Sequence, residues 1–421
     1  MKPFNIIRSA CTVLALTWMP GALQAAPDEN PAEEPVALFN GKNLNGWTKR
    51  QGSADFKVQD GCIVGTTVKG SSNTFLCTDR DYYNFDLRFE VKLDHDQVNS
   101  GCQVRSHTQV SPNHANGLVY GYQVGIDTTG MAGFVYDESG RGWLSKERQD
   151  PEKNSAFKKG SWNQYRIVCK DHIIKTWVNG VLVAELEDDQ SIGGLIGLQV
   201  HSVPGDLKWS VRWKNIQLLE LPDTDHQLTP LFTDTKFSNF ETTGGWFLDP
   251  ETEVVGFEPK PEEYVGRAPW TVYSNYLWLK EQYANFVCKF DYKLEPGGNS
   301  GFYFLVQDKK NPPPTGPELQ LEEGASKKGE NTNFHDCAGL MMGKPIRRAD
   351  KNIFKGANQW NRVLVRHQDK KLKVWHNGLK VHDIDLEDVP HVKGHPTKGF
   401  VGLQDHGLPV FYRGLAIKEI K

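Results

Sequence analysis

The sequence lacks the features of several common protein classes. Its 49 Lys and Arg residues are scattered and balanced by 52 Asp and Glu, so no basic stripe of the kind that binds nucleic acid is present. No Cys-x-x-Cys pair or Cys/His cluster has the spacing of a zinc site. No convincing amphipathic helical pattern occurs. These absences exclude nucleic-acid-binding and zinc-module classes and argue against a helical fold.

The N-terminus contains an apolar run that is too short for a membrane span. Ala10–Met19 falls below the roughly 20 residues that a transmembrane helix needs. Lys2 and Arg8 precede the run, and small residues at 22–25 follow it, in the order of a cleaved secretory signal peptide. We therefore predict a signal peptide over residues 1–25 and an exported protein, periplasmic or extracellular. A membrane anchor is the alternative.

Cysteines after this segment are few. Export would make the six that remain candidates for disulfides. Cys62 and Cys77 flank what reads as a hairpin, so they could face each other across neighbouring strands. Cys288 and Cys337 are the only pair in the C-terminal half. Buried free thiols are the alternative at each position.

An internal duplication organises the rest of the chain. A Trp-Asn pair, at 162–163 and again at 360–361, stands 16 residues before the Asn-Gly of a turn. Other anchors recur in the same order: LFNGKNLNGW with LFTDTKFSNF, NFDLRFEVKL with NFVCKFDYKL, NSG with NSG, and GLQVHS with GLQDHG. The sequence therefore predicts two copies of one domain, over residues 36–222 and 228–421.

Short alternating runs and turns predict the fold of each copy. Aromatic residues make up 11% of the chain, and 40 Gly and 23 Pro are present. Runs such as YRIVCK, IIKTWV and VLVAEL are separated by Asn-Gly, Gly-Gly and Pro-Gly turns. This pattern predicts an all-β protein in which each copy is a β-sandwich or jelly roll.

One predicted strand carries a row of polar side chains. In GPELQLEEG, residues 316–324, Glu318, Gln320 and Glu322 alternate with two leucines. Side chains two apart on a strand point to the same face, so the three polar groups share one side. The matching stretch of the first copy, GYQVGID, has Gln123 and Gly125 in the first two places and keeps only Asp127 as an acid.

Taken together, these ordered motifs resemble those of the 3-keto-disaccharide hydrolase family. They are LFNGKNLNGW, NSG, the G-x-E-x-Q strand, the Trp-Asn…Asn-Gly hairpin and GLQDHG, and the resemblance covers both copies. It implies two tandem concanavalin-like jelly-roll β-sandwiches, each with a concave face that binds sugar. Since the G-x-E-x-Q strand is complete only in the second copy, chemistry is expected there.

The chemistry that the resemblance implies begins with a sugar oxidised at carbon 3. The ketone acidifies the hydrogen on carbon 2, so a base can remove it and expel the group at carbon 1, after which water adds. Glu318 and His406 are the acid/base candidates, and Glu318 with Glu322 could bind a divalent cation such as Ca²⁺. Further candidates for substrate binding are Asn299, Gln320, Trp270, Tyr273, Asn99, Arg105 and His201.

Each of these assignments has an alternative. The polar row could be the solvated face of a strand, and His406 could be structural, because His201 survives in the copy that lacks the carboxylate. Arg105 matches a family arginine, but Leu305 replaces it in the second copy. The sequence favours a secreted glycoside hydrolase or lyase acting on 3-keto-glycosides or related disaccharides. A carbohydrate-binding protein without catalysis and a cell-surface interaction module are the alternatives.

Overall fold

The computed structural model describes residues 34–111, 114–145, 150–223, 228–242, 244–258, 275–324 and 333–421. Residues Glu34–Lys421 belong to one compact unit. The predicted signal peptide lies outside the described residues. Within those residues, no helix has both the length and the apolar character needed to cross a membrane.

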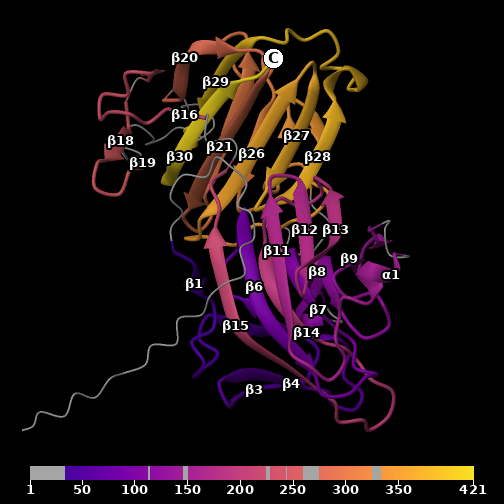
Figure 1. The fold of residues 1–421 in the computed structure, drawn as a ribbon. Coiled ribbons are helices and arrows are strands. Elements are labelled where there is room, and N and C mark those ends of the chain that lie inside the picture. The colour runs from indigo at the N-terminus through magenta and orange to yellow at the C-terminus, as the bar shows by residue number, and fades with distance from the viewer. Residues whose placement is uncertain are drawn as a thin grey trace, which may run out of the picture. The chain divides into compact units, whose positions relative to one another are not determined.

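The first half, residues 36–220, forms two antiparallel sheets (Figure 1). One sheet contains, in spatial order, β13 (Val181–Glu187), β12 (Ile173–Val178), β11 (Asn163–Lys170), β6 (Phe85–Leu93), β15 (Ser210–Glu220), β4 (Cys62–Thr66) and β3 (Asp55–Gln59), with β1 (Val36–Ala37) also beside β15. The other contains β10 (Gly142–Trp143), β9 (Val135–Glu138), β8 (His114–Ile126), β7 (Ser100–Ser111), β14 (Leu195–Val200), β5 (Thr74–Thr78) and β2 (Trp47–Gln51).

The second half, residues 229–419, repeats this arrangement. Its first sheet contains β28 (Leu379–Asp385), β27 (Lys371–His376), β26 (Asn361–Gln368), β21 (Phe286–Leu294), β30 (Val410–Glu419), β19 (Val254–Phe257) and β18 (Trp246–Asp249), with β16 (Thr229–Pro230) also beside β30. Its second sheet contains β25 (Pro345–Arg347), β24 (Leu340–Met341), β23 (Glu318–Glu322), β22 (Asn299–Val306), β29 (Gly399–Leu403), β20 (Leu277–Tyr283) and β17 (Phe240–Glu241).

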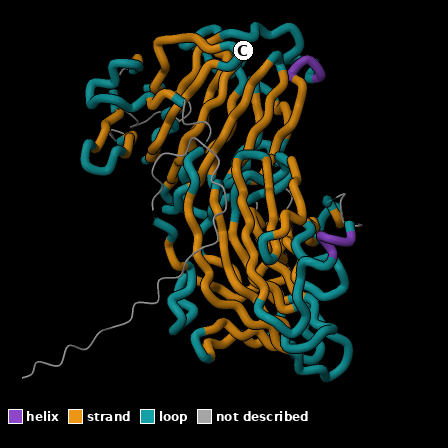
Figure 2. Tube along the Cα trace, in the orientation of Figure 1, coloured by secondary structure: helices purple, strands orange, loops and turns teal. Residues whose placement is uncertain are grey.

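The strand order is the same in both halves, position for position. The prediction of an all-β chain folded as two tandem jelly-roll sandwiches is therefore confirmed. Figure 2 shows that, in the part of the chain that the structure describes, helix is limited to short segments, which are α1 (Pro151–Asn154) and η3 (Leu386–Asp388). Asp150 caps α1 by accepting hydrogen bonds from the main-chain N–H groups of the first turn.

Side-chain alternation places a hydrophobic core between the two sheets of each half. Leu319 and Leu321 of β23 are fully buried in the core of the second half. Burying such a side chain contributes roughly 1.5–3 kcal/mol each. Because Glu318 and Gln320 alternate with these leucines, they lie on the opposite face of the strand. The core thus fixes which way the polar row points.

All six cysteines among the described residues are free and buried. The expected pairing of Cys62 with Cys77 is therefore wrong: Cys62 lies on β4 in one sheet, and Cys77 lies on β5 in the other. Cys288 and Cys337 are likewise unpaired. Burial raises the pKa of Cys77 and Cys337 to about 12, which makes both thiols poor nucleophiles.

The two halves contact each other through main-chain and charged groups. Ser191 and Leu379 form an isolated antiparallel β-bridge. Asp189 lies within 2.7 Å of Lys373 and 2.8 Å of Lys380, and its carbonyl accepts a 2.7 Å bond from the Trp375 indole. The proline-bounded connection 221–230 therefore joins halves that are held to each other.

Candidate functional site

Strand pairing assembles a polar face on the second half, on the side of β22 and β23 turned away from the core. Tyr303 is the cross-strand partner of Glu318, Gly301 of Gln320, and Asn299 of Glu322. On the next strands, Gly402 of β29 pairs with Tyr303 and with Trp278 of β20. We call this surface the Glu318 face; it comprises Tyr276, Trp278, Asn299, Gly301, Tyr303, Glu318, Gln320, Glu322 and Gln404.

Glu318 is held in a tight, largely dry environment. Its side chain is 7% exposed, and its Oε2 accepts a 2.6 Å hydrogen bond from the Tyr303 hydroxyl. Its Oε1 has no hydrogen-bond partner among the described residues. A Cβ on Gly301 would lie 2.2 Å from Oε1, so only glycine at 301 leaves room for this carboxyl position. The absence of a side chain at position 301 therefore leaves the space that the Glu318 carboxyl occupies.

Burial changes the acidity of Glu318. Desolvation raises the pKa of its carboxyl from 4.5 to about 7, opposed by the Tyr303 hydrogen bond and reinforced by the negative charge of Glu322. A carboxyl with a pKa near neutrality can both accept and release a proton under ordinary conditions. A strongly shifted carboxyl with a defined partner is a common mark of an active site.

Aromatic side chains surround the carboxyl. The rings of Tyr276 and Trp278 stack at 5.2 Å and 15°, and Tyr276 meets Tyr303 edge-on at 5.7 Å. Burial raises the pKa of Tyr276 to about 12, opposed by its hydrogen bonds with Gln404 and Tyr303. Gln404, Tyr276, Tyr303 and Glu318 thus form one connected chain of polar groups.

The other end of the face carries amides and a second acid. Gln320 Nε2 donates to Asn299 Oδ1 at 3.0 Å and to Glu322 Oε2 at 3.1 Å. Burial raises the pKa of Glu322, opposed by its hydrogen bond with Gln320. These groups lie in the rows beside Glu318 and can form hydrogen bonds with hydroxyl groups.

His406 follows β29 in the chain but does not belong to it. Gln404 N donates to Gly301 O at 2.8 Å, and β29 ends at Leu403, so His406 lies in the loop beyond the strand. Burial lowers the pKa of His406. Glu318 therefore lies on a strand of the Glu318 face, whereas His406 lies in a loop that follows a neighbouring strand.

The equivalent face of the first half lacks the carboxyl and the two tyrosine hydroxyls. Gln103 pairs with Gln123, and Gly101 with Gly125, in the registers that hold Tyr303–Glu318 and Gly301–Gln320 in the second half. Gln103 Nε2 donates to Gln123 Oε1 at 3.0 Å. In the same way Phe75 and Cys77 replace Tyr276 and Trp278. The carboxyl and both phenolic hydroxyls are absent together.

Arg105 belongs neither to the Glu318 face nor to its first-half equivalent. Its side chain is fully buried, and it donates to the carbonyls of Tyr83 and Asp171 at 2.8 and 2.6 Å and to Asn84 Oδ1 at 2.9 Å. Its backbone has a φ of +47°, close to the +54° of Leu305. Arg105 thus ties together the loops of the first half. Asn99 and His201 lie elsewhere in that half, beside a cavity described below, and Trp270 and Tyr273 lie outside the described residues.

The described residues do not build a metal site. They contain no group of three or more His, Cys, Asp or Glu side chains placed to bind an ion. Gln320 stands between Glu318 and Glu322, and the raised pKa of each acid disfavours the charged form that a hard cation needs. These residues do not fit a bound cation. The divalent ion stays a prediction from the sequence, and the proposed reaction does not use one.

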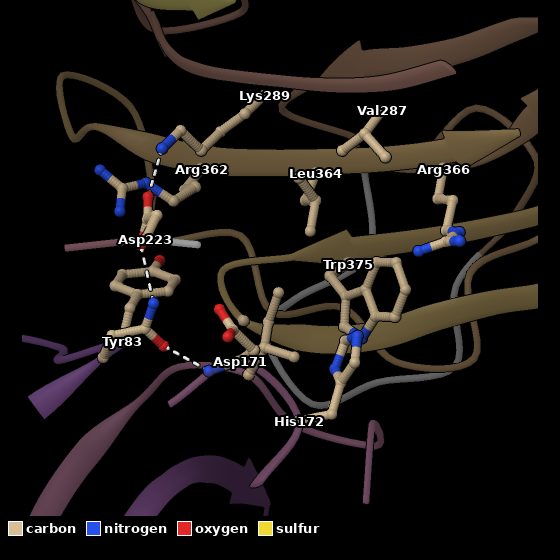
Figure 3. A pocket seen from close by; sticks show the side chains of 13 residues that line it. Tyr83, Asp171, His172, Asp223, Val287, Lys289, Arg362, Leu364, Arg366 and Trp375 are labelled. Atoms are coloured by element: carbon tan, nitrogen blue, oxygen red, sulfur yellow. Dashed lines mark hydrogen bonds and ion pairs between the residues drawn. The ribbon is translucent and has the colours of Figure 1, made fainter. Parts of the chain in front are cut away.

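A cavity of 260 Å³ between the halves is a second candidate (Figure 3). Its apolar floor includes Val287, Leu364 and Trp375. Most of its charged groups are already paired. Asp223 is bonded to Lys289 and Asn84. Arg362 is bonded to Asp291, and its guanidinium lies 4.4 Å from the centre of the Tyr83 ring. Because these groups hold the two halves together, the Glu318 face is the stronger candidate.

Sequence reasoning missed Tyr276, Tyr303, Gly301 and Gln404. A signal for Tyr303 was present, because NSGFYF and NSGCQV differ at this position just as the two copies differ at Glu318 and Gln123. Tyr276 and Gln404 come from distant parts of the chain, and only the strand order brings them to Glu318.

Comparisons with known proteins give one family match and several structural likenesses. A family model for a 3-keto-alpha-glucoside-1,2-lyase-like domain matches residues 34–219 and 227–418. A "putative glycosyl hydrolase" from Parabacteroides distasonis ATCC 8503 is 23% identical with a TM-score of 0.37, over 46% of this chain and 98% of that chain. The carbohydrate-binding module CBM66 from Bacillus subtilis is 13% identical with a TM-score of 0.32, over 42% and 97%. A search of curated proteins finds no match.

Proposed function

The chain belongs to the 3-keto-alpha-glucoside-1,2-lyase-like family, and from this premise we propose that its second half cleaves 3-keto-glycosides at the Glu318 face. The observation that supports this best is the buried Glu318 carboxyl, hydrogen-bonded at 2.6 Å to Tyr303 and with a pKa of about 7. The Glu318 face combines an acid/base group, stacked aromatic rings and amides, which are the groups a sugar-cleaving site needs.

The proposed reaction is an elimination followed by hydration. The Glu318 carboxylate takes the proton from carbon 2 of the keto-sugar. The electron pair of that C–H bond forms the double bond between carbons 1 and 2, and the bond from carbon 1 to the departing oxygen breaks. Protonated Glu318 returns the proton to the departing oxygen, and water then adds across the double bond. Protons and electrons balance, and no oxidant is required.

The neighbours of Glu318 are assigned supporting roles. The Tyr303 hydroxyl orients the carboxyl and, by donating to it, keeps part of it ionised. Gln320 and Asn299 are assigned to sugar hydroxyls, and a second sugar unit would extend toward His406. Because burial lowers the pKa of His406, its ring is mostly neutral at neutral pH, so it is assigned to binding rather than to proton donation.

Substitution of Glu318 tests the proposal directly. Glu318→Gln keeps the shape and removes the ionisable group, so turnover of a 3-keto-glucoside should fall by about 100-fold or more. Asp127→Asn, at the corresponding end of the first-half face, is the matched control and should leave turnover nearly unchanged. Equal losses in the two variants, both confirmed as folded by circular dichroism, would reject the assignment.

The alternative is a carbohydrate-binding protein without catalysis. It predicts that neither 3-keto-glucosides nor ordinary glycosides release an aglycone, while sugar binding persists. The elimination predicts release from the 3-keto-glucoside alone, because only the ketone acidifies carbon 2. An ordinary nitrophenyl glucoside and its 3-keto derivative, assayed side by side, separate these functions.

A further inference from the structure

The first half contains a cavity that belongs to neither the Glu318 face nor the contact between the halves. It measures 400 Å³, within the range of small-ligand pockets, and all of its lining residues come from the first half. Asn99, Thr129, His201 and Trp209 are among them, and Asp96 is the one acidic side chain of the lining. A mostly neutral polar lining around an aromatic ring suits an uncharged, hydroxyl-rich ligand.

Trp209 provides a fixed aromatic surface in this cavity. Its side chain is half-buried, and its ring stacks on His95 at 4.8 Å and 8°. The stack holds the indole in one orientation, so little side-chain freedom remains to be lost when a ligand binds. Trp209 also packs against the core of the first half, and the part of it that lines the cavity can meet the apolar C–H face of a sugar ring.

His201 is held in one orientation by its neighbours. Its Nδ1 lies 2.7 Å from the carbonyl of Ser202, and because a carbonyl only accepts, Nδ1 carries a hydrogen. Nε2 is the other polar atom of the ring. Ser202 N in turn donates to Asn73 Oδ1 at 2.9 Å, and Asn73 Nδ2 donates to buried Glu138 at 3.2 Å. These hydrogen bonds hold the main chain of Ser202 in place, and Ser202 in turn orients the His201 ring.

The aromatic residue is specific to the first half. Val211 of β15 pairs with Leu93, and Val410 of β30 pairs with Leu294, so Trp209 corresponds to Leu408. The half that lost the carboxyl of Glu318 thus has an aromatic ring where the half that keeps the carboxyl has none. A remnant of an inactive site would not account for this addition.

We propose that the Trp209 cavity is a separate binding site for a neutral sugar ring, such as the terminal hexose of an oligosaccharide. Trp209 packs against the ring face, while His201 Nε2 and the Asn99 amide form hydrogen bonds with hydroxyls. The proposal rests on the carbohydrate part of the proposed function and is independent of catalysis at Glu318. The first half would hold glycan while the second half carries out the chemistry.

Calorimetric titration of the full chain with cellobiose and with maltose tests this site. Trp209→Ala should weaken binding of the better disaccharide at least 10-fold, and Asn99→Ala, at an exposed position that folding tolerates, should weaken it about 3-fold or more. Trp162→Ala, which removes a half-buried tryptophan outside the cavity, should bind as the wild type does.

Each result decides the proposal. Absence of binding of both disaccharides by the wild type, or unchanged affinity in both Trp209→Ala and Asn99→Ala, would overturn it. Tighter binding of methyl glucuronide than of methyl glucoside would overturn the neutral class of ligand. Loss of turnover in Glu318→Gln with binding retained separates this site from the catalytic one, and retained turnover in Glu318→Gln would overturn only the proposed reaction.

Discussion

Replacing Glu318 by Gln should make the protein more stable above neutral pH while it removes activity. The folded-state pKa of about 7 lies above the ordinary 4.5, so the folded state favours the protonated carboxyl. The stabilising contribution of the protonated carboxyl is complete below pH 4.5 and is lost as the pH rises through 7. Gln resembles the protonated acid at every pH. Wild type and variant should therefore diverge as the pH increases.

The size of this divergence follows from the two pKa values. At about 1.36 kcal/mol for each pH decade, the interval from 4.5 to about 7 corresponds to roughly 3 kcal/mol. In the wild type Oε1 lacks a partner among the described residues, and in the variant the amide oxygen can keep the Tyr303 bond, so we expect packing to contribute little to the difference.

Urea unfolding of both proteins at pH 5 and pH 8, followed by tryptophan fluorescence, measures this difference. The free energy of unfolding of Glu318→Gln minus that of the wild type should rise by about 2.5 kcal/mol between these pH values, because a small part of the effect is already present at pH 5. All other titrating groups are common to both proteins and cancel. The mirror variant Gln123→Glu adds a carboxyl at the matching position and should lose stability at pH 8. A difference that stays constant with pH would refute the buried, neutral carboxyl on which the reaction rests.

The remaining predictions concern the neighbours of Glu318. Tyr303→Phe removes the hydrogen bond that opposes the raised pKa, so the acid limb of the pH–rate profile should move to higher pH; an unmoved limb would contradict the role of Tyr303. Gly301→Ala places a Cβ 2.2 Å from Oε1 and should lower turnover at least 10-fold, whereas Gly101→Ala, its first-half counterpart, should not. His406→Gln should reduce turnover less than Glu318→Gln and act mainly on KM; an equal loss of kcat would return the proton-donor role to His406. Cell fractionation should recover the chain, shortened by about 25 residues, outside the cytoplasm.

The duplication made much of the fold predictable. Two sets of ordered motifs fixed the number of sandwiches, and period-two alternation in runs such as YRIVCK predicted strands with one buried face. The same alternation predicted that Glu318 and Gln320 share a face. Local pattern sufficed here because a strand shows its two faces directly in its sequence.

Strand order and burial decide which residues meet at the site, and neither can be read from a local sequence pattern. Tyr276, Tyr303 and Gln404 lie on or beside three different strands, and only the order β20–β29–β22–β23 brings them to Glu318. The disulfide expectation failed for the same reason, because Cys62 and Cys77 are near in sequence but belong to different sheets. Arg105 looked like a site residue, yet its burial among loop carbonyls gives it a structural role.

The differences between the halves are best explained by a division of labour. If the first half were simply decaying, its losses would be scattered, but Phe75, Gln103 and Gln123 replace members of one connected group. Gln103 bonds to Gln123, so the replaced face is satisfied and packed rather than left with an unpaired acid. A buried carboxyl without a hydroxyl partner would destabilise the first half above neutral pH, and loss of the acid removes that cost. Stability therefore favours the amide pair at this position if the proposed reaction takes place in the second half, and the proposed Trp209 site would give the first half a role of its own.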